Sequence, residues 1–242
     1  MSRFSQFPEY IPVAVRRAKA AEKIAKMKKK GEIVHPVVIE GRTIARTFWG
    51  KSWCENLESY SDYENRLPRG RTYVRNGSVI DLQLSEGCIA ALVSGSSIYK
   101  VKIEIDKVCA QKWEALTSEC AGKIDSVIEL LQGKISKGVM EIITGQGNGL
   151  FPTPQEIHLG CSCPDYATMC KHVAAVLYGV GARLDASPQD LFSLRQINYD
   201  DLIRKVQEST LTQVSQSQEN SEFSDDLSDL FGINFAPDKN VA

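Results

Sequence analysis

Three cysteines and one histidine stand within twelve residues of one another in the C-terminal half of the chain. The stretch reads GCSCPDYATMCKH over residues 160–172, and it contains Cys161, Cys163, Cys170 and His172. The whole chain of 242 residues has three histidines and seven cysteines, so this short stretch contains a large share of them. Any fold of this chain has to accommodate two pairs of reactive side chains, Cys-x-Cys and Cys-x-His, separated by six residues.

The spacing within each pair predicts the local backbone. In an extended segment, residues two apart point to the same side, so Cys161 and Cys163 can face one point. In a helix, residues two apart diverge by about 200°. We therefore expect Cys170 in the turn before a helix and His172 in the first helical turn. Pro164-Asp165 favours a chain reversal that brings the two pairs together.

Three thiolates and one imidazole are a complete tetrahedral ligand set for Zn²⁺. Soft thiolates select zinc over magnesium or calcium. Four protein ligands leave no position for water, so the predicted zinc site is structural. Two alternatives remain open at this point: an iron–sulfur cluster, or buried free cysteines beside an unrelated histidine.

The remaining cysteines and a nearby histidine have other interpretations. Cys54, Cys88, Cys109 and Cys120 lack ligand spacing. Free cysteine behaves as a small hydrophobic residue, so we predict that all four are in the core. His158, three residues before the cluster, is interpreted as a residue on the surface of a strand, and the alternatives are a contact with the ligands or a role as an alternate ligand.

The motif CSCPDYATMCKH resembles the SWIM zinc finger, whose pattern is Cys-x-Cys, a variable loop and Cys-x-His. Two longer stretches, TFWGKSWCENLESYSDYENRLPRGRTYVRNGSV and CSCPDYATMCKHVAAVLYGVGARLD, are similar to bacterial SWIM finger proteins often associated with Swi/Snf-class helicase-like ATPases. The resemblance covers about residues 7–205. It implies a zinc-dependent module for binding DNA or protein, an ATPase of the Swi/Snf class as a partner, and the same four residues as ligands. It implies no particular reaction.

Alternating apolar residues predict an antiparallel meander of about four strands with one buried face. Residues 71–75 and 78–84 flank Asn76-Gly77, the strongest short hairpin signal. The stretches 88–93 and 99–105 continue the pattern. Residues 155–160 read as a strand that leads into the cysteine motif, and residues 33–48 read as extended.

Helical spacing appears both before and after these strands. Helices are predicted at 13–30, 50–60, 124–131, 136–144 and 173–184, after Asp106, and from Ser187 and Asn198 onward. The helix at 173–184 is apolar on all sides, which predicts that it packs against the body of the protein. The fold class is therefore α+β. Its predicted regions are a basic helical segment (1–34), an α+β domain (35–150), a zinc finger with packing helices (151–208) and a disordered acidic tail (209–242).

Charge is distributed unevenly along the chain, although the formal net charge is −1. The segment 16–30 holds eight basic residues and one acid, which is typical of a surface that faces nucleic acid. A second candidate surface lies in residues 65–75, where Arg69, Arg71, Tyr73 and Arg75 share one face if the segment is extended. The alternatives are a solvated helix face and an exposed strand edge. The candidate DNA contacts are Lys28, Lys29, Lys30, Arg69, Arg71, Tyr73, Arg75 and Lys171.

The acidic tail contains one short amphipathic pattern. Phe223, Leu227, Leu230 and Phe231 fall on one helical face among acidic residues. An isolated helix of this length is marginal, so we predict that a partner protein folds it in a groove. Packing on its own domain, or no role, are the alternatives.

These patterns narrow the function classes. No apolar run approaches the roughly twenty residues of a membrane span, and the N-terminal residues lack the order of a secretory signal, so we expect a cytoplasmic protein with no membrane partner. We expect a non-enzymatic DNA-binding or accessory factor with structural zinc. The alternative is a protein–protein adaptor without nucleic-acid contact. A nuclease that uses Asp62, Glu64 and Asp81 is a distant third.

Overall fold

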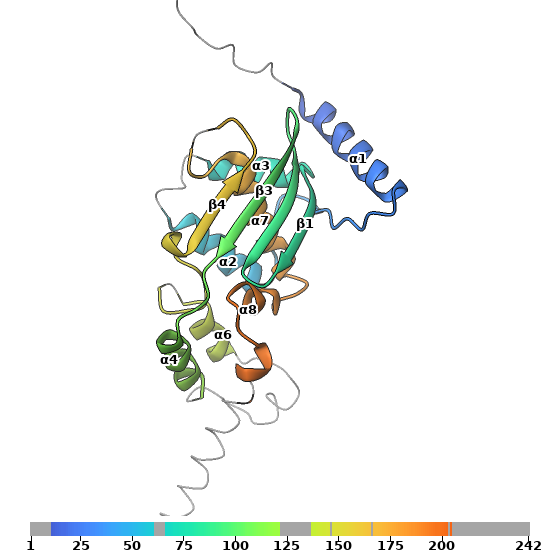
Figure 1. Cartoon of the computed structure of the whole chain (residues 1–242). Coiled ribbons are helices and arrows are strands. Elements are labelled where there is room, and N and C mark those ends of the chain that lie inside the picture. Colours follow the sequence, from blue (N-terminus) through green and yellow to red (C-terminus); the bar gives the residue numbers. More distant parts are fainter. Residues whose placement is uncertain are drawn as a thin grey trace, which may run out of the picture.

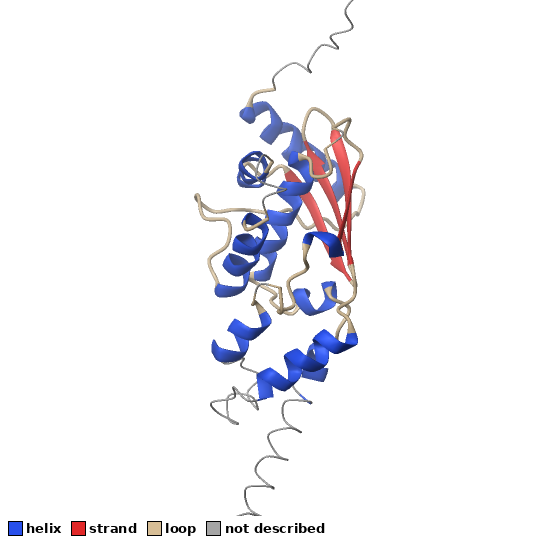
Figure 2. Cartoon of the chain, turned by 90° about the vertical axis from the view of Figure 1, so that its left-hand side faces the viewer, coloured by secondary structure: helices blue, strands red, loops and turns tan. Residues whose placement is uncertain are grey.

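The computed structural model describes residues 11–60, 66–121, 137–145, 147–165, 167–202 and 204. Helices lie against one face of a four-stranded antiparallel sheet, which confirms the α+β class (Figure 1 and Figure 2). None of the helices in these ranges combines the length and apolarity that a membrane crossing needs. The elements are α1 (Val13–Lys29), α2 (Phe48–Glu58), α3 (Leu67–Arg75), β1 (Val79–Ser85), β2 (Cys88–Ser94), β3 (Ile98–Ile105), α4 (Ala110–Ala121), α6 (Lys137–Ile143), a short 3₁₀ helix (Pro154–Glu156), β4 (Ile157–Cys161), α7 (Lys171–Leu184) and α8 (Asp190–Leu194).

The sheet has the strand order β1-β2-β3-β4, with all neighbours antiparallel. The first three strands form the predicted meander, in which Ile89 lies opposite Ile103. The fourth strand is the predicted segment that leads into the cysteine motif. It pairs with β3, and its last pair joins Val101 to Cys161. The first predicted metal ligand therefore lies at the end of a hydrogen-bonded strand.

The segment 71–75, predicted as the first strand of the meander, is instead the last part of helix α3. Leu67, Gly70 and Val74 are buried along one side of this helix, at the spacing of an apolar helical face. Asn76-Gly77 therefore closes no hairpin: it ends α3 and turns the chain into β1, with Gly77 at φ +66°. A hairpin signal needs a strand on each side, and the helical spacing of apolar residues prevents one here.

Helix α7 lies at the centre of the core and contacts all four strands as well as α2 and α3. Most of its residues are buried, as its apolar composition predicts. A glycine allows the close approach of α3, because a Cβ on Gly70 would stand 2.4 Å from the Cβ of Ala174. On the α2 side, Trp53 Nε1 donates a hydrogen bond to Leu177 O at 2.8 Å. The sheet and the helix that follows the cysteine motif thus share one hydrophobic core.

The segment between α1 and α2 lies along the outer edge of β1. Val37 N donates to Val79 O at 3.1 Å, and Leu82 N donates to His35 O at 2.9 Å. These bonds fit the extended conformation predicted for this stretch and occupy backbone groups of an edge strand.

Four helix predictions have different outcomes. The helices at 50–60 and 136–144 are confirmed as α2 and α6. The helix expected after Asp106 begins only at Ala110, and the Asp106 carboxylate instead lies 2.9 Å from His158 Nε2. The predicted helix at 124–131 and the acidic tail at 209–242 lie outside the described residues.

Candidate metal centre

The four clustered residues come from the end of β4 and the beginning of α7. Cys161 is the last residue of β4, and Cys163 follows two residues later. Between them, Ser162 points to the other side and is held on β3, because its N–H donates to Lys100 O at 3.0 Å and its Oγ accepts from Lys100 N at 2.9 Å. This double attachment keeps the backbone extended, so both thiols face the same point.

The second pair begins α7 as the spacing predicted. Cys170 is the N-cap residue, with an extended backbone, and His172 is the second residue of the helix. The loop between the pairs is anchored by Asp165, which lies 3.4 Å from the Arg66 guanidinium of the neighbouring segment. The chain reversal expected after Cys163 is therefore present and held from outside the motif.

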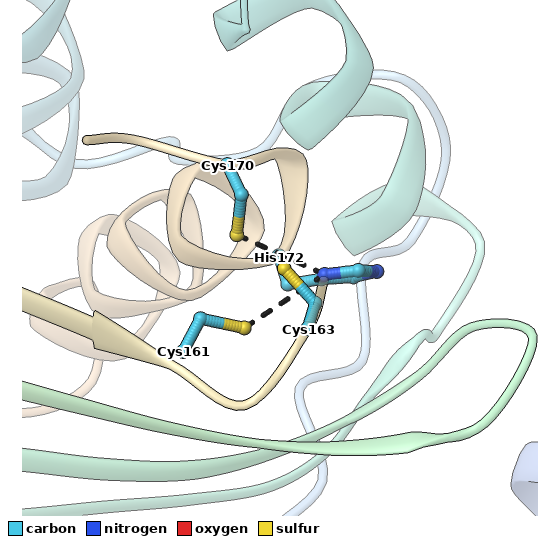
Figure 3. Close-up of side chains that lie close together, drawn as sticks. All are labelled: Cys161, Cys163, Cys170 and His172. Atoms are coloured by element: carbon cyan, nitrogen blue, oxygen red, sulfur yellow. Dashed lines mark hydrogen bonds between the residues drawn. The ribbon is translucent and has the colours of Figure 1, made fainter. Parts of the chain in front are cut away.

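The four ligand atoms form a compact cluster (Figure 3). They all lie within 4.8 Å of one another. His172 Nδ1 is 3.9 Å from Cys161 Sγ and 3.8 Å from Cys170 Sγ. Tetrahedral zinc, with bonds of about 2.3 Å to sulfur and about 2.0 Å to nitrogen, places neighbouring ligand atoms about 3.5 to 3.8 Å apart. A structural zinc ion fits these four residues if the distances between their ligand atoms decrease slightly.

Burial opposes ionisation of Cys161, Cys170 and His172. It raises the pKa of the Cys161 thiol well above its ordinary value, and it also raises the pKa of the Cys170 thiol. Burial, together with a smaller contribution from the charge of neighbouring Lys171, lowers the pKa of His172 to about 4. The imidazole is therefore neutral at pH 7, as metal binding requires. The two thiols need the charge of a bound cation to exist as thiolates at that pH.

The imidazole of His172 is fixed from several sides. Its ring lies against Tyr99, with centroids 4.3 Å apart, and meets Tyr73 edge to face at 5.4 Å. A Cβ on Gly95 would stand 3.1 Å from Nε2, so this position allows the turn between β2 and β3 to approach the ring. Nε2 is buried and has no hydrogen-bond partner among the described residues. These aromatic contacts, and not a carbonyl or carboxylate, orient the histidine.

The predicted DNA-contacting residues of α3 divide between two sides of the helix. Arg69 and Tyr73 lie one turn apart on one side, whereas Arg71 and Arg75 line a hollow on the other side. The expectation that all four share one face is wrong, because it assumed a strand. Their role in binding nucleic acid stays a prediction.

The other predicted basic residues lie on different elements. Lys171 Nζ stands 5.5 Å from the centre of the Tyr73 ring, so it joins the side of Arg69 and Tyr73. Lys28, Lys29 and Lys30 are exposed at the C-terminal end of α1, roughly 20 Å along the axis from Arg16. Phe223, Leu227, Leu230 and Phe231, the predicted partner-binding residues, lie outside the described residues.

Sequence reasoning missed the specific position of Arg16. Its guanidinium lies 4.6 Å above the centre of the Tyr73 ring, although the two residues are 57 positions apart in the sequence. Tyr99 and Gly95, which contact the histidine, were not singled out either. No spacing or motif links these positions, because the packing of α1 and of the β2–β3 turn brings them together.

The four remaining cysteines and His158 lie away from the cluster. Cys120 is buried, and Cys54 and Cys88 are partly buried. Cys109 is exposed, so its predicted place in the core is wrong: the helix that would bury it starts one residue later, at Ala110. His158 is exposed on β4 and pairs with Asp106, as a strand-surface residue.

Comparison with known proteins agrees with this geometry. The uncharacterized protein Rv2102 of Mycobacterium tuberculosis is 36% identical over 166 residues, which cover 67% of this chain and 60% of that protein. The chain thus spans less than two thirds of this relative. No solved structure matches the chain. A family model described as the SWIM zinc finger matches residues 148–180, which include all four clustered residues. The C-terminal region of this chain therefore contains a SWIM zinc finger with a Cys₃His site for structural zinc.

Proposed function

We propose that this protein is a non-enzymatic accessory factor that binds DNA through a cationic surface built against its zinc finger. One observation carries the proposal: Tyr73 gathers Arg16 and Lys171 directly beside the zinc ligand His172. We call the side chains of Arg16, Arg69, Tyr73 and Lys171 the Tyr73 surface.

The Tyr73 surface has the chemistry of a phosphate contact. Arg16 and Lys171 lie near the aromatic ring, where cation–π attraction limits their motion, and neither forms an ion pair among the described residues. Arg69 is exposed one helical turn before Tyr73. Unpaired cations attract the DNA backbone through release of its counterions, without reading the sequence.

The cationic surface continues along α1. A hollow of about 230 Å³ lies between this helix and the β2–β3 turn, with three lysines on one wall and Ser94 on the other. Lys26 is paired there with Glu22, so Lys19 and Lys23 supply the positive charge. Ser94 Oγ is buried and has no hydrogen-bond partner in the described part of the chain. The hollow extends the positive surface from Arg16 toward Lys28, Lys29 and Lys30, which supports DNA contact along most of the helix.

Zinc is coupled to this surface through His172. A metal ion bound at Nδ1 stops rotation of the ring, and the ring packs on Tyr73 and Tyr99. Because Arg16 already lies over the Tyr73 ring, the tyrosine positions cations for phosphates in this proposal and does not stack on bases. Binding is then expected for single- and double-stranded DNA alike.

The ligand set supports a non-enzymatic role for the metal. Catalytic zinc keeps one coordination position for water or substrate, whereas four protein ligands complete a tetrahedral shell. Here two cysteines from the β4 end and a cysteine and a histidine from α7 supply all four.

The test is fluorescence anisotropy of the zinc-loaded full chain with DNA that has 5′-hydroxyl ends, over a range of salt concentrations. The double variant Arg69→Gln/Lys171→Gln removes two cations of the Tyr73 surface. We expect it to weaken binding and to reduce the slope of log affinity against log salt by about 1 to 2. A control for position is Lys137→Gln on α6, which removes one cation at the opposite end of the molecule (Figure 1). No binding at low salt, or equal losses in both variants, would refute the proposal and favour a protein adaptor.

We also propose a Swi/Snf-class ATPase as the protein partner, on family resemblance alone, with Phe223, Leu227, Leu230 and Phe231 of the tail as its contact. The test is co-purification of such an ATPase with the full chain and with a chain that lacks residues 219–242. Deletion should abolish capture while zinc content stays unchanged. Equal capture by the two chains would show that the tail is not the contact.

A further inference from the structure

A second hollow lies on the side of α3 that faces away from Tyr73. Its volume is about 410 Å³, within the range of pockets that hold small organic molecules. It is open to solvent and is bordered by α2, α3, the second turn of α7 and the segment 42–45. We call it the arginine hollow. Its charged lining residues are Arg42, Lys51, Arg71, Arg75, Glu55 and Glu58.

The charges of the arginine hollow do not balance. Glu58 forms an ion pair with Arg71. Arg42, Lys51 and Arg75 have no ion-pair partner among the described residues, and Glu55 is the one acid left to face them. The lining therefore carries an excess of about two positive charges, which favours a dianion over a monoanion.

Arg71 is held in place before any ligand arrives. Its Nη2 donates to Tyr178 Oη at 3.1 Å and to the Glu58 carboxylate, while the Tyr178 hydroxyl donates to the same carboxylate at 2.9 Å. The guanidinium also lies 5.4 Å from the centre of the Tyr178 ring. Tyr178 is fully buried and belongs to the core helix α7. A planar guanidinium fixed in this way presents its remaining N–H groups in a constant direction.

Arg75 has an unused donor. Its Nε is buried and has no hydrogen-bond partner in the described part of the chain. A buried N–H without an acceptor is unfavourable, so native structures satisfy nearly all such groups with protein, water or ligand. Arg75 lies one turn after Arg71 on the same side of α3, so one oxyanion can accept from both guanidinium groups.

We propose that the arginine hollow binds a small phosphomonoester, with Arg71 and Arg75 holding the phosphate and with Lys51 and Arg42 at the rim. A phosphate dianion matches the excess positive charge, and guanidinium groups bind its oxygens in pairs. A phosphate alone fills only part of the hollow. Ile44, Ala45 and Cys54 provide an apolar wall for the organic part of the ligand. The site is separate from the Tyr73 surface and goes beyond the proposed DNA binding.

The test is isothermal titration calorimetry of the zinc-loaded full chain with thymidine 5′-monophosphate, inorganic phosphate and thymidine as probes. We expect saturable binding of the monophosphate, weaker binding of phosphate and no binding of thymidine. Arg75→Gln should weaken binding of the monophosphate about tenfold or more, because it removes one charge-assisted contact. The matched control is Arg69→Gln on the other side of the same helix, which should bind the monophosphate like the wild type.

Three outcomes would overturn the inference. One is the absence of saturable binding by either phosphate probe. Another is an equal loss in Arg75→Gln and Arg69→Gln, which would indicate attraction to general surface charge. The third is equal affinity for inorganic phosphate and the monophosphate, which would exclude recognition of an organic part. If Arg75→Gln does not fold, Lys51→Gln at the exposed rim replaces it as the test, and we expect its affinity for the monophosphate to fall several fold. The DNA anisotropy of the same variants is a separate readout, so either proposal can fail alone.

Discussion

The two sides of α3 show how one short helix supplies two different charged surfaces. On one side, Tyr73 holds Arg16 and Lys171, and the zinc ligand His172 lies behind the ring. On the other side, Arg71 is held by Glu58 and Tyr178 without any metal ligand. His172 and Tyr178 both belong to α7, in successive turns. The comparison shows that α7 organises both surfaces, but only the first depends directly on zinc.

Zinc removal should have the largest effect and should disturb both sides of α3, because His172 and Tyr178 both belong to α7. Structural zinc in small modules contributes on the order of 10 kcal/mol, and α7 fills the core here. We expect Cys163→Ser, or chelation of the wild type, to unfold residues 155–185, to lower the melting temperature strongly and to abolish DNA binding. Circular dichroism and metal analysis measure these changes.

The matched control for this prediction is Cys109→Ser, which changes an exposed thiol outside the cluster. It should melt like the wild type and keep its zinc. An unchanged melting curve in chelator, with zinc shown to be absent, would mean that the metal does not hold α7.

Gly70→Ala tests whether both sides depend on the contact between α3 and α7. The added Cβ would meet Ala174 Cβ at 2.4 Å and its backbone carbon at 2.8 Å, so the helices have to move apart. We expect a loss of about 1–3 kcal/mol in the free energy of unfolding, measured by urea denaturation. Thr72→Ala, on the exposed side of α3, is the control and should change stability by no more than about 0.5 kcal/mol. A neutral Gly70→Ala would show that the two helices are loosely packed.

Alkaline pH tests the thiol of Cys54, which lines the arginine hollow. Burial, with a smaller contribution from the Glu58 charge, raises the pKa of Cys54 to about 12. Cys54 is not part of the metal cluster, so a bound zinc ion does not stabilise its thiolate. The unfolded thiol ionises near pH 8.5, so above that pH the unfolded state binds fewer protons and stability falls as pH rises toward 12. We expect the wild type to lose about 1–2 kcal/mol more than Cys54→Ala between pH 8 and pH 10. Parallel pH profiles of unfolding free energy would contradict this prediction.

The smallest expected effect concerns single arginines in DNA binding. Arg16→Gln should weaken DNA affinity a few fold and lower the salt slope by about 1, because Arg16 belongs to the Tyr73 surface. Arg71→Gln should stay within about twofold of the wild type, since its charge is already paired with Glu58. Anisotropy with DNA that carries 5′-hydroxyl ends measures both. A larger loss in Arg71→Gln would remove the proposed distinction between the two sides.

Much of the fold could be predicted because its signals are local. Alternation over 78–84, 88–93 and 99–105 predicted three strands, and the apolar run at 173–184 predicted the buried helix. The error at 71–75 came from a local signal as well, since Asn76-Gly77 suits a hairpin but also suits the end of a helix. The packing of Gly70 against Ala174 stabilises the helix, and that contact joins residues about a hundred positions apart.

The sequence by itself determined the ligand set and the local backbone around it, because ligand type and a spacing of two residues are properties of short segments. Only the tertiary structure decided what surrounds the finger. It placed Arg16 over Tyr73, and it set Arg71 between Glu58 and Tyr178. Such neighbours follow from how α1, α2 and α3 pack on the sheet and on α7, and no pattern along the chain records contacts that packing alone creates.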